Sequence, residues 1–124
     1  MTSSQVRVAD YIASLLADHG IRDVFLVTGG GAMHLNDAIG REKRLRWFCC
    51  HHEQACAIAA ESYYRLTNRL AAINVTSGPG GTNAITGVFG AWTDSMGMVV
   101  ISGPSIAIAS PPSIPAESIV MCAT

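Results

Sequence analysis

The sequence predicts an α/β fold with a doubly wound, mainly parallel sheet that is incomplete at its C-terminal end. Segments with apolar residues at helical spacing alternate with short, largely apolar segments along residues 1–103. The connections between them are short, which favours parallel strands joined by right-handed crossovers. Two of the apolar segments lead directly into glycine-rich turns, at residues 28–31 and 77–81.

The first part of the chain predicts two helices around one central strand. Met1 to His19 is expected to form a helix, with Thr2 as N-cap and Gly20 as the C-terminal stop. The next segment is apolar on both faces, as in a parallel strand covered on both sides; its apolar residues are Ile21, Val24, Phe25, Leu26 and Val27. A second helix is expected from about Ala32 to Gly40. The first helix has helical spacing at Val8, Ile12, Leu15, Leu16 and His19, and the second should bury Met33, Leu35 and Ile39.

The second part continues the alternation. Trp47 to Cys50 is predicted to be a buried strand, followed by a helix from Glu53 to Leu66. Leu70 to Thr76 is the third predicted strand, Thr82 to Thr93 the fourth helix, and Met98 to Ser102 the fourth strand. The residues of the fourth helix that are expected to face inward are Ile85, Val88, Phe89 and Trp92.

The chain changes character after residue 103. The last 21 residues hold four of the five prolines and show no period. We therefore expect one domain over residues 1–103 and a divergent, mostly irregular tail over residues 104–124, with one short strand near its end.

Composition narrows the class of protein. Net charge is −1 and only 14% of residues are charged, whereas 49% are hydrophobic, so another surface is expected to cover part of the domain. Seven arginines and one lysine form no basic patch for nucleic acid, and the group at residues 41–46 suggests a solvated helix end. No apolar run has the length of a membrane span or resembles a signal peptide. The cysteines, predicted to be buried thiols of a cytoplasmic protein, are Cys49, Cys50, Cys56 and Cys122.

Three predicted strand ends should converge on one edge of the sheet, at residues 28–31, 51–53 and 77–83. The glycine turns could bind phosphate or could be simple tight turns, and no complete phosphate-binding motif is present. His51 and His52 are adjacent and point to opposite sides in an extended segment, so no metal site is predicted. His34 is expected to be structural, although it could reach a substrate. Ser77 lacks the context of a nucleophile.

Glu53 is the main candidate for chemistry. It stands between a predicted buried strand and an alanine-rich helix, where a carboxylate is poorly solvated. Such a group is expected either to have a dedicated partner or to hold its proton more tightly than usual, and groups of this kind cluster at functional sites. The alternative is a first-turn acid that interacts with the helix dipole.

Three runs of sequence carry a family resemblance: VFLVTGGGAMHLNDAI, HHEQACAIAAESYYRLT, and INVTSGPGGTNAITGVFGAWTDSMGMVVISG. They resemble the N-terminal pyrimidine-binding domain of thiamine-diphosphate enzymes, most closely the acetolactate synthase group. The resemblance extends over about residues 6–103. The pair H-E-Q-A and T-S-G-P-G-x-T-N is far more specific than a glycine motif alone.

The resemblance implies a flavodoxin-like thiamine-diphosphate-binding fold and a role for Glu53. In this family the corresponding glutamate hydrogen-bonds N1′ of the cofactor aminopyrimidine and favours the imino tautomer that removes the C2 proton. A 2-keto acid then loses carbon dioxide, with the cofactor as electron sink. The resemblance also implies that the pyrimidine ring is bordered by Val27, Thr28, Gly29 and Gly30. Thr76, Pro79 and Asn83 would contact the ring or shape its pocket, and His52 would flank Glu53 in the cofactor site.

Some positions depart from the synthase pattern. Thr28 and His34 stand where synthases usually have proline, and the doubled His51-His52 resembles a subgroup found in surface-sugar gene clusters. The product could therefore be acetolactate, or an acyl group transferred to a keto-sugar nucleotide.

Family members complete the cofactor site with a diphosphate-binding domain that holds Mg²⁺ through a G-D-G segment, and no such segment occurs here. Some synthases also bind FAD in a middle domain, which nothing in this sequence supports. We expect a truncated or frame-shifted chain that is inactive on its own. Its partner would be a second copy or a chain carrying the diphosphate-binding domain, against the helices that begin near Glu53 and Thr82. The competing hypotheses are a non-catalytic module that pairs with intact homologues and a stand-alone nucleotide-binding domain.

Overall fold

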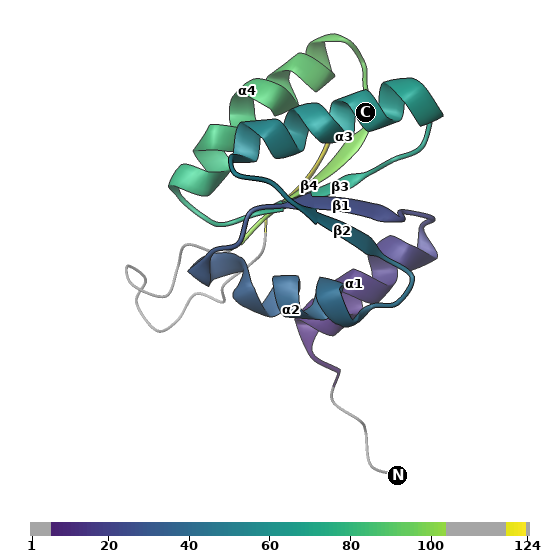
Figure 1. Ribbon diagram of the computed structural model, residues 1–124, viewed down its shortest axis with the longest axis vertical. Coiled ribbons are helices and arrows are strands. Elements are labelled where there is room, and N and C mark those ends of the chain that lie inside the picture. The colour runs from purple at the N-terminus through teal and green to yellow at the C-terminus, as the bar shows by residue number, and fades with distance from the viewer. Residues whose placement is uncertain (1–5, 104–118, 124) are drawn as a thin grey trace.

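The computed structural model describes residues 6–103 and the backbone of residues 119–123. One five-stranded sheet has the order β2-β1-β3-β4-β5, with α1 and α2 on one face and α3 and α4 on the other (Figure 1). The first four strands are parallel, and β5 pairs antiparallel with β4. The predicted α/β class and mainly parallel sheet are confirmed. The elements are α1 (Val8–Asp18), β1 (Asp23–Leu26), η1 (Gly30–Ala32), α2 (Met33–Arg41), β2 (Arg46–Cys49), α3 (Glu53–Thr67), β3 (Ala72–Val75), α4 (Pro79–Thr93), β4 (Met98–Ser102) and β5 (Ile119–Ala123).

Helix α1 begins at Val8, later than predicted, so a start near Met1 is wrong. Arg7 is the N-cap residue, and its side chain pairs with Asp10 in the first helical turn. Thr2 lies outside the described residues. The helix ends at Asp18, and Gly20 follows with a φ of +82°, a left-handed conformation that suits glycine. The predicted stop at Gly20 is therefore confirmed.

Helix α4 buries a different face from the one predicted, although Val88 packs against the core as expected. Ile85, Phe89 and Trp92 are exposed and Val88 is half-buried. Helix α4 is apolar nearly all round, so the size of its residues decides the orientation. The small residues allow close approach to α3, and the large ones remain outside. The buried residues of α4 are Gly80, Ala84, Gly87 and Ala91.

The predicted strand before Glu53 is confirmed, but its predicted burial is wrong, because β2 is an exposed edge strand. Among the described strands it pairs only with β1, and all its residues are exposed, Trp47 and Phe48 included. The prediction of buried thiols is correct for Cys56 but wrong for Cys49, which β2 leaves exposed. The side chain of Cys122 and residues 104–118 lie outside the described part of the chain. A smaller correction concerns Met33, which is exposed instead of packed inward. Of the residues with helical spacing in α1, Val8, Leu15 and His19 are exposed.

The central strand β3 is buried over its whole length and separates two apolar clusters. The cluster under α1 and α2 is centred on Leu16, Val24 and Ile39. The cluster under α3 and α4 contains Cys56 and Ile73. Within the described ranges, no helix has both the length and the apolar character that crossing a membrane requires.

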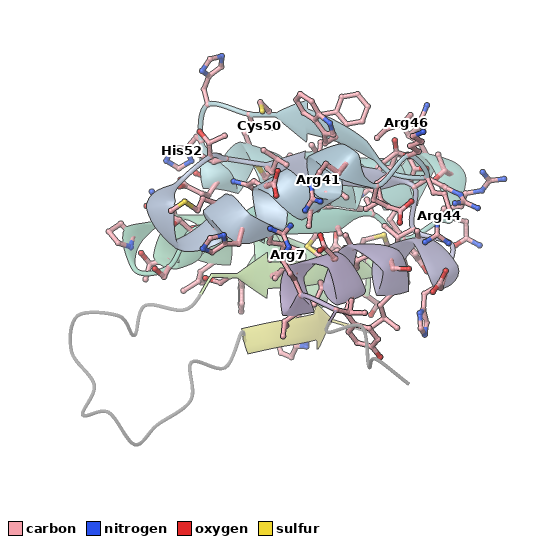
Figure 2. The ribbon with its side chains drawn as sticks, turned by 90° about the horizontal axis from the view of Figure 1, so that it is seen from below. Arg7, Arg41, Arg44, Arg46, Cys50 and His52 are labelled. Carbon is pink, nitrogen blue, oxygen red and sulfur yellow. The ribbon has the colours of Figure 1, made fainter. Side chains whose placement is uncertain are left out.

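The basic group at residues 41–46 was predicted to be a solvated helix end. The structure shows in addition that its arginines form ion pairs with nearby carboxylates. Arg41 bridges Asp10 of α1 and Asp37 of α2 at 2.7 and 3.0 Å. Arg44 pairs with Asp18 and with Glu42. Figure 2 shows Arg7 and Arg41 between α1 and α2. Every one of these ion pairs has at least one partner that is two-fifths or more exposed, so the pairs orient the two helices without adding much stability.

Arg44→Ala is expected to raise the pKa of Glu42. Hydrogen bonds from the Arg44 side chain, then from its backbone N–H, lower the Glu42 pKa from 4.5 to about 2. Because the folded pKa is the lower one, this contribution to stability is present above pH 4.5 and is lost as the pH falls toward 2. A carbon-detected NMR titration of Glu42 measures the shift, with Arg22→Ala as control. An unchanged Glu42 pKa in Arg44→Ala would contradict the assignment.

Candidate functional site

The candidate site lies at the carboxyl edge of the sheet. In the sheet register Leu26 is opposite Cys49 of β2 and Asn74 of β3, so these strands end side by side. Helices α3 and α4 begin directly after β2 and β3, and their N-termini meet at the same edge. The segments at residues 28–31, 51–53 and 77–83 are thereby brought together.

Glu53 is the first residue of α3 and is only 9% exposed. The preceding His52 is the N-cap, and its Nδ1 accepts a hydrogen bond from the Gln54 backbone N–H at 3.1 Å. This bond uses the Nδ1 atom of the His52 ring to cap the start of the helix. The Asn83 Nδ2 of α4 donates to Glu53 Oε2 at 3.1 Å. Glu53 thus has a dedicated partner, one of the two outcomes expected for a poorly solvated carboxylate.

The second carboxyl oxygen, Glu53 Oε1, faces the first turn of α4. A Cβ at Gly80 would lie 3.2 Å from Glu53 Oε1 and 2.7 Å from Thr76 Cγ2. A side chain here would clash with Thr76 and crowd the carboxylate. Across residues 6–103, Oε1 takes part in no hydrogen bond. The site therefore presents a nearly buried carboxyl group with one oxygen held and the other available.

The two glycine-rich turns touch each other around Thr76. A Cβ at Gly29 would lie 2.7 Å from Thr76 Cβ, and one at Gly31 would lie 2.9 Å from Ser77 Oγ. Gly29 has a φ of −171°, so close packing and not backbone conformation requires glycine there. Thr76 lies between Gly29 on one side and Gly80 on the other. The turn at residues 28–31 is thus held close to the Glu53 segment.

The remaining predicted residues vary in placement. Val27 is half-buried and its N–H donates to the Asn74 carbonyl at 3.3 Å. Thr28 and Gly30 are exposed, and a Cβ at Gly30 would meet nothing within 4 Å. Pro79 is exposed in the first turn of α4, after Gly78 with a φ of 64°.

Sequence reasoning missed Gly80 and Gly31 as individual site residues. Gly80 lies against Glu53, and Gly31 lies against Ser77. The signal was present, because both are in the glycine-rich turns and Gly80 stands three residues before Asn83. What was missing was the helix pairing that brings Gly80 to Glu53.

His34 and Gly31 line a common cavity. This cavity of about 240 Å³ lies on the α1 and α2 side of the sheet, and its lining includes His34, Asn74 and Gly103. Of the carboxylates and imidazoles in the described ranges, no three gather with a geometry that could hold a metal ion.

The arrangement offers one carboxyl oxygen for hydrogen bonding. Oε1 of Glu53 can accept or donate one hydrogen bond in a poorly solvated position, and glycines instead of side chains stand beside it. The described ends of α3 and α4 at this edge carry no other acid than Glu53.

Comparison with known proteins identifies the family. Residues 6–111 match the family described as thiamine pyrophosphate enzyme, N-terminal TPP binding domain. The acetolactate synthase large subunit of Haemophilus influenzae is 42% identical over 95 residues, 77% of this chain and 17% of the relative. The acetolactate synthase isozyme 3 large subunit of Escherichia coli is 38% identical over 95 residues, again 77% of this chain and 17% of the relative. The probable acetolactate synthase 2, chloroplastic, of Oryza sativa is 37% identical over 80% of this chain and 15% of the relative.

The match includes every element that forms the site, from β1 to the end of β4. The chain spans about one sixth of the length of these curated relatives. The chain therefore belongs to the thiamine pyrophosphate enzymes, as their N-terminal TPP binding domain.

Proposed function

We propose that this domain forms the pyrimidine-binding part of a thiamine-diphosphate site in a 2-keto-acid decarboxylating and carboligating enzyme similar to acetolactate synthase. The observation that carries the proposal is Glu53: a nearly buried carboxyl group with Oε2 held by Asn83 and Oε1 available beside Gly80. The names of the relatives favour acetolactate as product over an acyl group transferred to a keto-sugar nucleotide.

When bound, the cofactor supplies the electron sink for the loss of carbon dioxide from a 2-keto acid. Glu53 holds or releases a proton at Oε1, toward N1′ of the aminopyrimidine. Asn83 fixes the other carboxyl oxygen, so the proton exchanges at one defined atom. The low exposure of Glu53 limits competition from water for that hydrogen bond.

The other predicted site residues would line the binding site of the pyrimidine ring. Val27, Thr28, Gly29 and Gly30 would border the ring from the turn after β1, and Thr76 and Pro79 from the turn after β3. The close contact between Gly29 and Thr76 supports a shared wall, because it holds the two turns together. His52 would contribute through the N-cap that fixes the start of α3.

Mg²⁺ and the diphosphate are expected to be held by a diphosphate-binding domain, either of a second copy or of a partner chain. The surface that supports such a partner is the exposed apolar side of α3 and α4. A row of large side chains this exposed is typical of an interface. Its members are Ile58, Leu66, Ile85, Phe89 and Trp92. The free thiols of Cys50 and Cys56 suit the reducing cytoplasm.

Co-purification with a chain that carries the diphosphate-binding domain tests this function. With thiamine diphosphate and Mg²⁺, the pair is expected to exchange the cofactor C2 proton in NMR measurements. This chain alone should show weak or no binding by titration calorimetry. Association without exchange would favour a non-catalytic module, and nucleotide binding without a partner would favour a stand-alone nucleotide-binding domain. Either result would overturn the proposal.

A further inference from the structure

His52 holds the start of α3 through a ring nitrogen that can also take up a proton. It is the N-cap residue of the helix, with extended backbone angles of φ −154° and ψ 142°. Its Nδ1 accepts a hydrogen bond from the Gln54 backbone N–H at 3.1 Å, and its carbonyl accepts one from the Cys56 N–H at 3.3 Å. Figure 2 shows His52 on the turn after Cys50. Two bonds to one residue therefore hold the turn in which Glu53 lies.

The bond to Nδ1 requires an uncharged imidazole ring. A nitrogen that accepts a hydrogen bond from an N–H group cannot carry a proton itself, so Nδ1 is bare and the ring proton is on Nε2. In the positively charged ring both nitrogens carry protons and neither can accept. Capping of α3 by Nδ1 and protonation of the His52 ring are therefore mutually exclusive.

Few charged groups surround this ring. The turns at residues 28–31 and 77–83, which meet the start of α3 at the same edge, contain no acidic, basic, histidine or cysteine residue. In the ring's own segment Cys50 and His51 precede it and Glu53 follows it. The helix dipole disfavours a positive ring at the N-terminus of α3, whereas an ionised Glu53 would attract it. In both cases the helix N–H loses its acceptor once the ring is charged.

We propose that His52 is a positioning residue for Glu53 that acts only while its ring is neutral. Histidine ordinarily changes its charge between roughly pH 5 and pH 8. As the pH falls through this range, the ring takes a proton from solvent, the bond to Gln54 breaks, and the first turn of α3 loosens. The cap favours the neutral ring, so its contribution to stability is present at the upper end of the range and lost at the lower end. An effect on proton transfer at Glu53 rests on the proposed function, whereas the loss of the cap does not.

Two substitutions separate capping from titration. Asparagine caps helices well and does not titrate, so His52→Asn should keep the cap at every pH, and His52→Ala should lack it at every pH. We expect the unfolding equilibrium constant of the full chain, divided by that of His52→Asn, to rise about 5-fold from about pH 8 to about pH 5, the usual size of an N-cap effect. The same ratio for His52→Ala should not change with pH. Urea unfolding followed by circular dichroism gives these constants, and the other histidines cancel in each ratio.

NMR on the unsubstituted chain observes the bond itself. A coupling through the hydrogen bond, between the Gln54 amide nitrogen and His52 Nδ1, should be present at about pH 8 and disappear with the same midpoint as the imidazole titration. His51→Gln is the matched control and should leave both the coupling and the 5-fold change intact. A proton on Nδ1 at the higher pH, or a ratio to His52→Asn that stays constant while the ring titrates, would refute the proposal.

Cofactor C2 exchange in the assembled enzyme separates this proposal from the proposed function. The exchange rate should fall more steeply with acid in the unsubstituted protein than in His52→Asn, because only the former loses the cap. Identical pH profiles would refute a positioning role for His52. Absence of exchange at every pH, together with a cap that titrates, would refute the proposed function and leave the pH-dependent cap established.

Discussion

Glu53→Gln is expected to lower the rate of cofactor C2 proton exchange by at least about 100-fold in the assembled enzyme, as loss of a general acid–base group typically does. Glutamine has nearly the same shape and can keep the contact with Asn83, which now joins Asn83 Nδ2 to Glu53 Oε2 at 3.1 Å. It cannot give up and regain a proton at the position of Oε1. The loss should therefore appear in the exchange rate measured by NMR, with little change in cofactor affinity.

Glu61→Gln is the matched control. Glu61 is on the same helix and its Oε1 pairs with Arg65 at 2.6 Å, away from the carboxyl edge of the sheet. The same chemical change there should leave C2 exchange unaltered. Equal exchange rates in Glu53→Gln and Glu61→Gln would show that Glu53 is a structural first-turn acid and not a proton-transferring group.

The order of elements was predictable because β1, β2 and β3 each lead by a short turn into a helix. The burial of β3 followed from its apolar run, and the start of α3 at Glu53 followed from the change to alanine-rich sequence. For β2, by contrast, the apolar sequence led to a wrong prediction of burial. Trp47 and Phe48 have the residue types of an interior strand, yet β2 is at the edge of the sheet and both side chains are exposed. Strand order is a property of the assembled sheet and not of one segment.

The site was predictable in its segments but not in its contacts. Glu53 and Asn83 are 30 residues apart, and the resemblance brought both to the cofactor without indicating a hydrogen bond between them. The contact depends on how closely α3 and α4 approach. That distance is set by glycines, whose role cannot be read from hydrophobic periodicity because they contribute no apolar side chain. This is also why the face of α4 was predicted incorrectly.

Gly87→Ala should destabilise the full chain by about 1–2 kcal/mol, the cost of overpacking less the gain in helix propensity. A Cβ at Gly87 would lie 2.6 Å from Ala57 Cβ, 3.2 Å from the Gln54 carbonyl oxygen and 3.3 Å from the Ile58 nitrogen. These atoms are in or next to the backbone of α3, so they cannot move without the helix. Urea unfolding followed by circular dichroism measures the change.

Gly90→Ala makes the same substitution three residues later on α4. A Cβ there would meet only Glu61 Oε2, at 3.9 Å, which is an ordinary contact. The helix propensity gain should then dominate and stabilise the chain by up to about 1 kcal/mol. Opposite signs at Gly87 and Gly90 would identify the spacing of α3 and α4 as the quantity that glycine protects. Equal signs would contradict this. Since Glu53 and Asn83 are on these two helices, Gly87→Ala should also lengthen the distance between Glu53 Oε2 and Asn83 Nδ2.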